Sequence, residues 1–140
     1  IFDQKETRIL TVAPERTFWE KATILHHEAN RPEHLKIPPG YSRHYYDIYC
    51  MSKTMVKKEA FEQLDLLEKV VAFKMKFYPR GWAKYSEAVP GSLKLLPPAF
   101  RSGDLAMDFD SMKDMLYGEI PSFETFMVTI GELEKEINAL

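Results

Sequence analysis

Apolar residues along this chain recur mostly at intervals of three and four, the spacing that places side chains on one face of an α-helix. The spacing predicts helices over about residues 15–30, 43–53, 57–78, 104–117 and 123–138, and leaves open a break in the third near residues 63–65. Residues 7–13 are instead rich in β-branched and apolar side chains, which predicts a short strand. The expected fold class is therefore mainly α, a helical bundle with one short N-terminal strand.

Proline, glycine and capping residues mark where these elements should begin and end. Pro14 suits the first turn of a helix, and the proline-rich segment 31–41 reads as a loop. Ser42 and Ser122 are the expected N-caps, and Gly118 the expected C-cap, of the helices beside them. The apolar segment 93–98 ends in two prolines and is expected to cross the bundle as an extended arm. The third helix should direct inward a stripe made of Leu67, Val70, Val71, Lys74 and Phe77.

A lone strand cannot satisfy its own backbone hydrogen bonds. It needs a sheet outside this sequence, a second copy of the chain, or a strand that the pattern does not reveal. The chain also begins at Ile1 without an initiator methionine. Both features favour a C-terminal portion of a longer protein, with residues 1–140 forming one helical domain and the strand offering a route to self-association.

Composition places the chain among globular proteins of the cytoplasm. Its 140 residues are 45% hydrophobic and 29% charged, enough apolar content for one packed core. The single cysteine, Cys50, excludes an internal disulfide and suits a reducing compartment. No apolar run approaches the roughly 20 residues of a membrane span, so no membrane partner is expected.

Charge is distributed unevenly beneath a net value of −2. Residues 31–80 carry ten Lys or Arg against six Asp or Glu, a balance of +4, whereas residues 101–140 carry three against nine, a balance of −6. The central part could attract phosphates, although solvated helix faces often have the same composition. Charge alone does not establish nucleic-acid binding.

Lys21 is the most informative charged residue. It follows Phe18 by three positions and precedes Leu25 by four, so it lies near the apolar face of its helix. A lysine at such a position needs an anion, since its charge is costly to remove from water. The anion could be structural, Glu28 or Asp47, or it could be the phosphate of a nucleotide.

Asp47 shares a helix face with Arg43 and His44. A surface ion pair with Arg43 accounts for that spacing, at well under about 1 kcal/mol. The neighbouring tyrosines make the helix too aromatic for a fully solvated one. A carboxylate beside phenols and a lysine suits a general base or an acid that assists a metal, and the spacing does not choose between these possibilities.

No metal site is expected in this sequence. His26 and His27 lack the His-Glu-x-x-His spacing that places two imidazoles on one helical face, and the other two histidines have no second ligand in register. The aromatic residues between positions 73 and 85 are interpreted as core and interface, and not as a platform for stacking bases.

Two segments resemble the C-terminal part of the AbiEii/AbiGii-type toxin family, whose members are nucleotidyltransferase-like proteins of the DNA polymerase β superfamily in toxin–antitoxin and abortive-infection systems. The segments are Pro14-Glu15-Arg16-Thr17-Phe18-Trp19-Glu20-Lys21 and Ser42-Arg43-His44-Tyr45-Tyr46-Asp47-Ile48-Tyr49. Weaker similarity continues through Val70-Val71-Ala72-Phe73-Lys74, Pro90-Gly91-Ser92-Leu93 and Leu133-Glu134-Lys135-Glu136-Ile137-Asn138. It covers nearly the whole chain.

The resemblance implies an enzyme that transfers a nucleotide from a nucleoside triphosphate to an acceptor, with RNA the expected acceptor. Lys21 and Asp47 match the family's late lysine and aspartate and are the expected catalytic residues, while Lys21 and Arg43 are expected to bind the nucleotide. The family's glycine loop and magnesium-binding Asp-x-Asp pair have no counterpart, because Asp108-Phe109-Asp110 lies inside a predicted helix. Magnesium and nucleoside triphosphate are therefore expected in the full-length protein, and these 140 residues alone are expected to be inactive.

The alternative hypothesis is a helical interaction module without catalysis. It would bind an antitoxin protein, or a second copy, through the acidic end, the apolar arm and the strand.

Overall fold

The computed structural model describes residues 13–116 and 120–140, and these residues are mainly helical with no strand among them. Their helices are α2 (Pro14–Ala29), α3 (Ser42–Ser52), α4 (Met55–Phe61), α5 (Leu64–Phe77), α6 (Ser102–Met112) and α7 (Phe123–Asn138). Short 3-10 turns occur at Gly81–Ala83, Tyr85–Glu87, Ala99–Arg101 and Lys113–Met115. None of these helices is long and apolar enough to cross a membrane.

The predicted strand at about residues 7–13 lies outside the described residues except for Ala13, which caps α2 and is not in a strand. The structure therefore gives no support to a strand there or to self-association through it. Gly118, the predicted C-cap, also lies outside the described residues.

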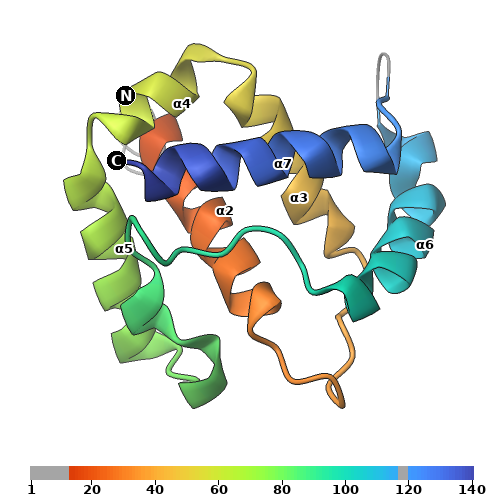
Figure 1. Cartoon of the computed structure of the whole chain (residues 1–140), viewed down its shortest axis with the longest axis horizontal. Coiled ribbons are helices and arrows are strands. Elements are labelled where there is room, and N and C mark those ends of the chain that lie inside the picture. Colours follow the sequence, from red (N-terminus) through yellow and green to blue (C-terminus); the bar gives the residue numbers. More distant parts are fainter. Residues whose placement is uncertain (1–12, 117–119) are drawn as a thin grey trace, which may run out of the picture.

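Helix α2 is the centre of the bundle and packs against α3, α4 and α5 (Figure 1). Its predicted inward residues Phe18, Ala22 and Leu25 are completely buried. Trp19, one position from Phe18, is equally buried, and its indole N–H donates to the carbonyl of Ala60 over 3.1 Å. Helix α2 thus holds α4 by a hydrogen bond as well as by apolar contact.

The predicted third helix is divided into α4 and α5 at residues 62–63, where the sequence left a break open. Within α5, Leu67, Val70 and Val71 are buried as predicted. Phe77, predicted to point inward, is 56% exposed, so this part of the prediction was wrong. The Phe77 ring instead packs on Phe73 of its own helix at 4.7 Å between ring centroids.

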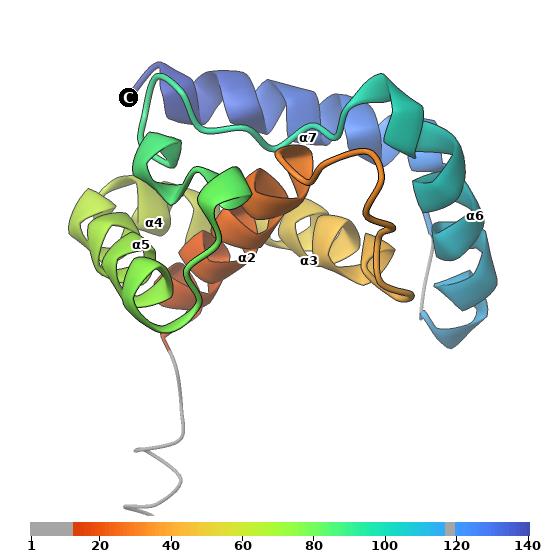
Figure 2. The same ribbon diagram turned by 90° about the horizontal axis from the view of Figure 1, so that it is seen from below.

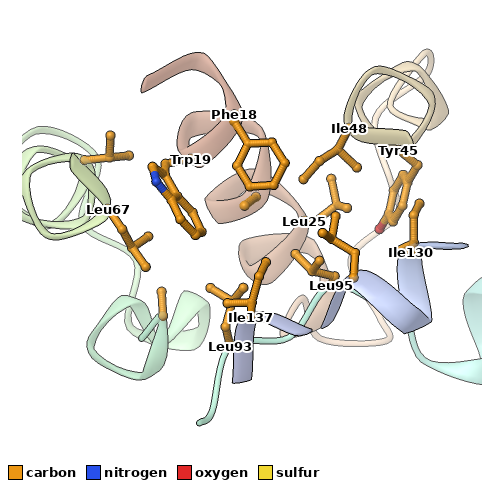
Figure 3. Packing of buried hydrophobic residues seen from close by; sticks show 14 of the residues in the cluster. Phe18, Trp19, Leu25, Tyr45, Ile48, Leu67, Leu93, Leu95, Ile130 and Ile137 are labelled. Atoms are coloured by element: carbon orange, nitrogen blue, oxygen red, sulfur yellow. The ribbon is translucent and has the colours of Figure 1, made fainter. Parts of the chain in front are cut away.

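The extended segment 91–98 and α7 together cover one side of α2 (Figures 1 and 2). Leu93 and Leu95 of this segment are buried beside Leu25 and Ile137, as Figure 3 shows. Because its backbone has no strand partner, side chains satisfy its hydrogen bonds. Those side chains are Asn138, which bonds Gly91 and Leu93, and Glu134, which accepts from the N–H groups of Leu95 and Leu96.

His26 is completely buried and joins α2 to this extended segment. Its Nδ1 accepts the backbone N–H of Lys94 at 3.0 Å, so the proton lies on Nε2, which donates to the carbonyl of Lys84 at 2.8 Å. Burial lowers the pKa of His26, against the opposing effect of the Lys84 carbonyl. The neutral ring is therefore the form that the fold accommodates.

Stability should fall with acid because of His26. The unfolded chain takes up this proton near pH 6.5, whereas the folded chain takes it up at a lower pH, so the stabilisation is complete above pH 6.5 and is lost as the pH falls below it. The slope from one such group is at most about 1.4 kcal/mol per pH unit. Urea unfolding between pH 7.5 and 5 should show this loss, and a flatter profile for His26→Gln. An unchanged slope in the variant would contradict the assignment.

Candidate functional site

Helix α2 places the Lys21 side chain at the edge of the bundle's core. Lys21 lies on the same helix as the buried residues Phe18, Ala22 and Leu25, but its own side chain stays 23% exposed. The ammonium group is therefore directed toward α3 and remains reachable from solvent. This is the position near the apolar face that the helical spacing predicts.

Helix α3 brings Arg43, His44 and Asp47 to the same place. Lys21 Nζ lies 3.1 Å from Asp47 Oδ2, while Arg43 Nε donates to Asp47 Oδ1 at 3.0 Å. Lys21 Nζ also lies 3.2 Å from His44 Nδ1. The predicted catalytic pair is thus in direct contact, with Arg43 on the other oxygen of the same carboxylate.

His44 serves as a neutral acceptor for the Lys21 ammonium. Burial lowers the pKa of His44, and the Lys21 charge lowers it further. A neutral imidazole can present the Nδ1 lone pair to a lysine N–H, whereas imidazolium cannot. Sequence reasoning placed His44 on the face of Asp47 but did not predict this contact, because it depends on how α2 and α3 pack.

This geometry is compatible with two uses. As an interhelical ion pair, with Lys21 and Asp47 each about a quarter exposed, it would stabilise the fold by no more than about 1 kcal/mol. As a reactive site, it offers two fixed cations for phosphate oxygens and one carboxylate that can accept a proton.

Lys74 adds a third cationic side chain, which the sequence placed in an inward stripe without assigning it a role. Its Nζ donates to the carbonyl of Glu20 at 3.2 Å, which joins α5 to α2. Burial lowers the pKa of Lys74 to about 8; the nearby carboxylate of Glu20 acts in the opposite direction and the Lys21 charge in the same one. Two lysines held close enough to oppose each other's charge make the region favourable for an anion.

A magnesium ion does not fit these residues. Mg²⁺ is held by oxygen ligands in octahedral geometry. Asp47 is the carboxylate of this cluster, and each of its oxygens is engaged by a cation. Across residues 13–116 and 120–140, no group of three His, Cys, Asp or Glu side chains could hold a metal ion.

Asp108, the first acid of the Asp-x-Asp segment, caps the N-terminus of α3 although it lies on another helix, α6. Its Oδ1 accepts the N–H of Gly40 at 2.8 Å, and its Oδ2 accepts the N–H of Ser42 at 2.9 Å and the Ser42 hydroxyl. The predicted Ser42 N-cap was wrong, since Ser42 is the first residue of α3 and Tyr41 precedes it without a side-chain cap. The predicted Ser122 N-cap is confirmed, because its Oγ accepts from the N–H of Thr125.

Removing this remote cap should destabilise the protein. Asp108→Ala leaves two backbone N–H groups and one hydroxyl without their acceptor, and we expect a loss of about 1–3 kcal/mol of unfolding free energy in a denaturant titration. Asp110→Ala is the matched control, since Asp110 is 71% exposed and its ion pair is with exposed Lys113. Equal losses in the two variants would show that Asp108 does not anchor α3.

The chain matches the profile of one protein family. The family is described as nucleotidyl transferase AbiEii toxin, Type IV TA system, and the match covers residues 1–129. No curated protein and no solved structure matches the chain.

Proposed function

This chain belongs to the AbiEii nucleotidyl transferase toxin family of Type IV toxin–antitoxin systems, and from that premise we propose that it forms the phosphate-binding side of a nucleotidyltransferase. Lys21 and Arg43 would contact the phosphates of a nucleoside triphosphate, and Asp47 would assist transfer of the nucleotide to RNA. The observation that carries the proposal is the convergence of Lys21, His44, Arg43 and Asp47 within 3.2 Å contacts across two helices.

The pairing of Asp47 suggests how its two roles are linked. Before substrate binds, both oxygens of Asp47 are engaged, one by Lys21 and the other by Arg43. A triphosphate carries more charge than one carboxylate and competes for the same cations. Once Lys21 and Arg43 bind the phosphates instead, an oxygen of the Asp47 carboxylate is free to accept a proton.

The proposed transfer is a displacement at the α-phosphorus of the nucleoside triphosphate. An acceptor hydroxyl forms a bond to the α-phosphorus while the bond from that phosphorus to the pyrophosphate oxygen breaks. The hydroxyl proton passes to Asp47, and Lys21 offsets the charge that develops on the phosphate oxygens. No step is assigned to magnesium, because the described residues do not fit it; carboxylates outside them would have to hold that ion in the full-length protein.

Nucleotide transfer by the full-length protein tests this proposal. Wild type and Asp47→Asn are incubated with α-labelled nucleoside triphosphates and RNA, and the labelled product is quantified. We expect at least a tenfold slower transfer for Asp47→Asn. Glu136→Gln is the control, because Glu136 also pairs with a lysine of another helix, Lys57, at 3.2 Å. Transfer at the wild-type rate by Asp47→Asn would remove the proposed role.

An antitoxin partner is a separate proposal supported by the family, which is one of toxin–antitoxin systems. The extended arm does not provide the expected interface, since Leu93 and Leu95 are buried within the protein's own core. The strand likewise lies outside the described residues. Among the described residues, the acidic C-terminal region is therefore the candidate surface that remains. Stable association with an antitoxin that spares the Lys21–Asp47 region would favour this role.

A further inference from the structure

A hollow of about 240 Å³ lies between α2, the segment before α3, the end of α5 and the turns that follow α5. Its walls consist of one aliphatic, four aromatic or imidazole and two cationic side chains: Ile24, His27, Tyr41, Tyr78, Tyr85, Lys74 and Arg80. No carboxylate lines it. This composition suits a ligand that is flat at one end and anionic at the other.

Among the described residues, neither cation of the hollow forms a direct ion pair, although the Glu20 carboxylate acts on Lys74 from beyond 4.0 Å. Lys74 forms no ion pair within 4.0 Å among residues 13–116 and 120–140, and its ammonium bonds only a carbonyl oxygen there. An ammonium has three donors, so two remain for a ligand. Arg80 is exposed and offers a guanidinium fork, which matches phosphate geometry. The burial that lowers the pKa of Lys74 also makes a bound anion more stabilising there.

The aromatic walls are held in place by their own contacts. The His27 ring stacks on Tyr85 at 6.0 Å between centroids with 16° between planes, and His27 Nδ1 bonds Glu28 at 2.9 Å. Tyr78 is 61% exposed and its ring packs on Phe73. An exposed aromatic face such as that of Tyr78 can stack with any nucleobase, because every base has a π-face.

Three residues that line the hollow lie close to the residues of the Lys21 region. Ile24 lies one helical turn after Lys21 on α2. Tyr41 meets His44 edge to face at 4.8 Å, and the Lys21 charge acts on Lys74. A ligand in the hollow would therefore lie beside the phosphates that Lys21 is proposed to bind.

We propose that this hollow binds one nucleotide unit, with its base against Tyr78 and its phosphate on Lys74 and Arg80. The inference rests on the proposed function, because it assigns the pocket to a substrate of the same reaction. Two sources carry this chemistry: the nucleoside triphosphate itself and the terminal nucleotide of the RNA acceptor. The same residues would serve either, and binding measurements distinguish them.

The test measures binding to the full-length protein by three probes: a nucleoside triphosphate, inorganic triphosphate and a short unstructured RNA. The variants are Lys74→Met and Tyr78→Ala, and Lys69→Met is the control because Lys69 is an exposed lysine of the same helix. We expect Lys74→Met to lower the affinity for whichever probe binds in the hollow by at least tenfold. Tyr78→Ala should lower the affinity for that probe but leave the affinity for inorganic triphosphate unchanged. Lys69→Met should leave the affinities for all three probes unchanged.

Stability provides a second readout. Lys74→Met should raise the thermal unfolding midpoint without ligand while it weakens binding, because removing a buried charge outweighs the loss of the hydrogen bond to the Glu20 carbonyl. If the role of Lys74 were structural, the substitution would lower the midpoint instead.

A loss of affinity confined to the nucleoside triphosphate or to RNA identifies which of the two binds in the hollow. Unchanged binding of all probes by both Lys74→Met and Tyr78→Ala would overturn the proposal.

Failure of this inference is distinguishable from failure of the proposed function. If Lys21→Met and Asp47→Asn lose turnover while Lys74→Met and Tyr78→Ala bind normally, only the nucleotide pocket is wrong. If the pocket variants lose binding while Lys21→Met and Asp47→Asn turn over normally, only the catalytic roles are wrong.

Discussion

Replacing Lys21 with methionine should lower the rate of nucleotide transfer by the full-length protein about 10²–10³-fold. The ammonium group is proposed to offset charge on the phosphate oxygens as transfer proceeds, a stabilisation that methionine cannot supply. Methionine keeps most of the aliphatic stem, so packing at the core edge should be preserved. The loss should appear in kcat and in kcat/KM, since the interaction strengthens in the transition state.

The matched control for this prediction is Lys57→Met. Lys57 also forms an ion pair between helices, at 3.2 Å to Glu136, and its side chain is 30% exposed against 23% for Lys21. Both substitutions should change the free energy of unfolding by no more than about 1 kcal/mol. A rate loss shared by the two variants would indicate a general effect of removing surface charge, and the proposed role of Lys21 would not stand.

The largest effect on stability is expected from Trp19→Ala, at about 3–5 kcal/mol of unfolding free energy. The Trp19 side chain is completely buried and contacts the Phe18 ring edge to face at 5.1 Å. It also stacks on Phe61 of α4 at 6.3 Å. Alanine would leave a cavity between α2 and α4 and would leave the Ala60 carbonyl without its indole donor.

Trp19→Phe separates the two parts of that loss. Phenylalanine fills much of the volume but cannot donate to Ala60, so its cost should be smaller than that of alanine. Urea unfolding monitored by circular dichroism measures both variants. Destabilisation below about 1 kcal/mol for Trp19→Ala would contradict the assignment of Trp19 to the centre of the core.

Periodicity in the sequence predicted the parts of the fold that depend on one helix at a time. Phe18, Ala22 and Leu25 are buried because a helical spacing fixes which side chains share a face. The exposure of Phe77 was not predictable in this way, because the helical pattern does not show which side chains the neighbouring elements cover at the end of α5. The replacement of a local Ser42 cap by Asp108 likewise depends on the position of α6.

In the candidate site, too, features of single helices were predicted and contacts between distant residues were not. The two helices that carry Lys21 and Asp47 were predicted, and so was an anionic partner for Lys21, with Asp47 as one option. The contact of Lys21 with His44 and the hollow around Lys74 arise from residues far apart in the chain. The inward-facing Lys74 in the stripe of α5 was the signal in the sequence that could have indicated the hollow.

A double-mutant cycle in single-turnover nucleotide transfer tests the central claim most directly. Lys21→Met, Asp47→Asn and the combined variant are compared with wild type in the full-length protein. If the two side chains act as one site, each single variant is strongly impaired and the double variant is little slower than the worse single one. Wild-type turnover in either single variant, or rate losses that simply multiply, would contradict it.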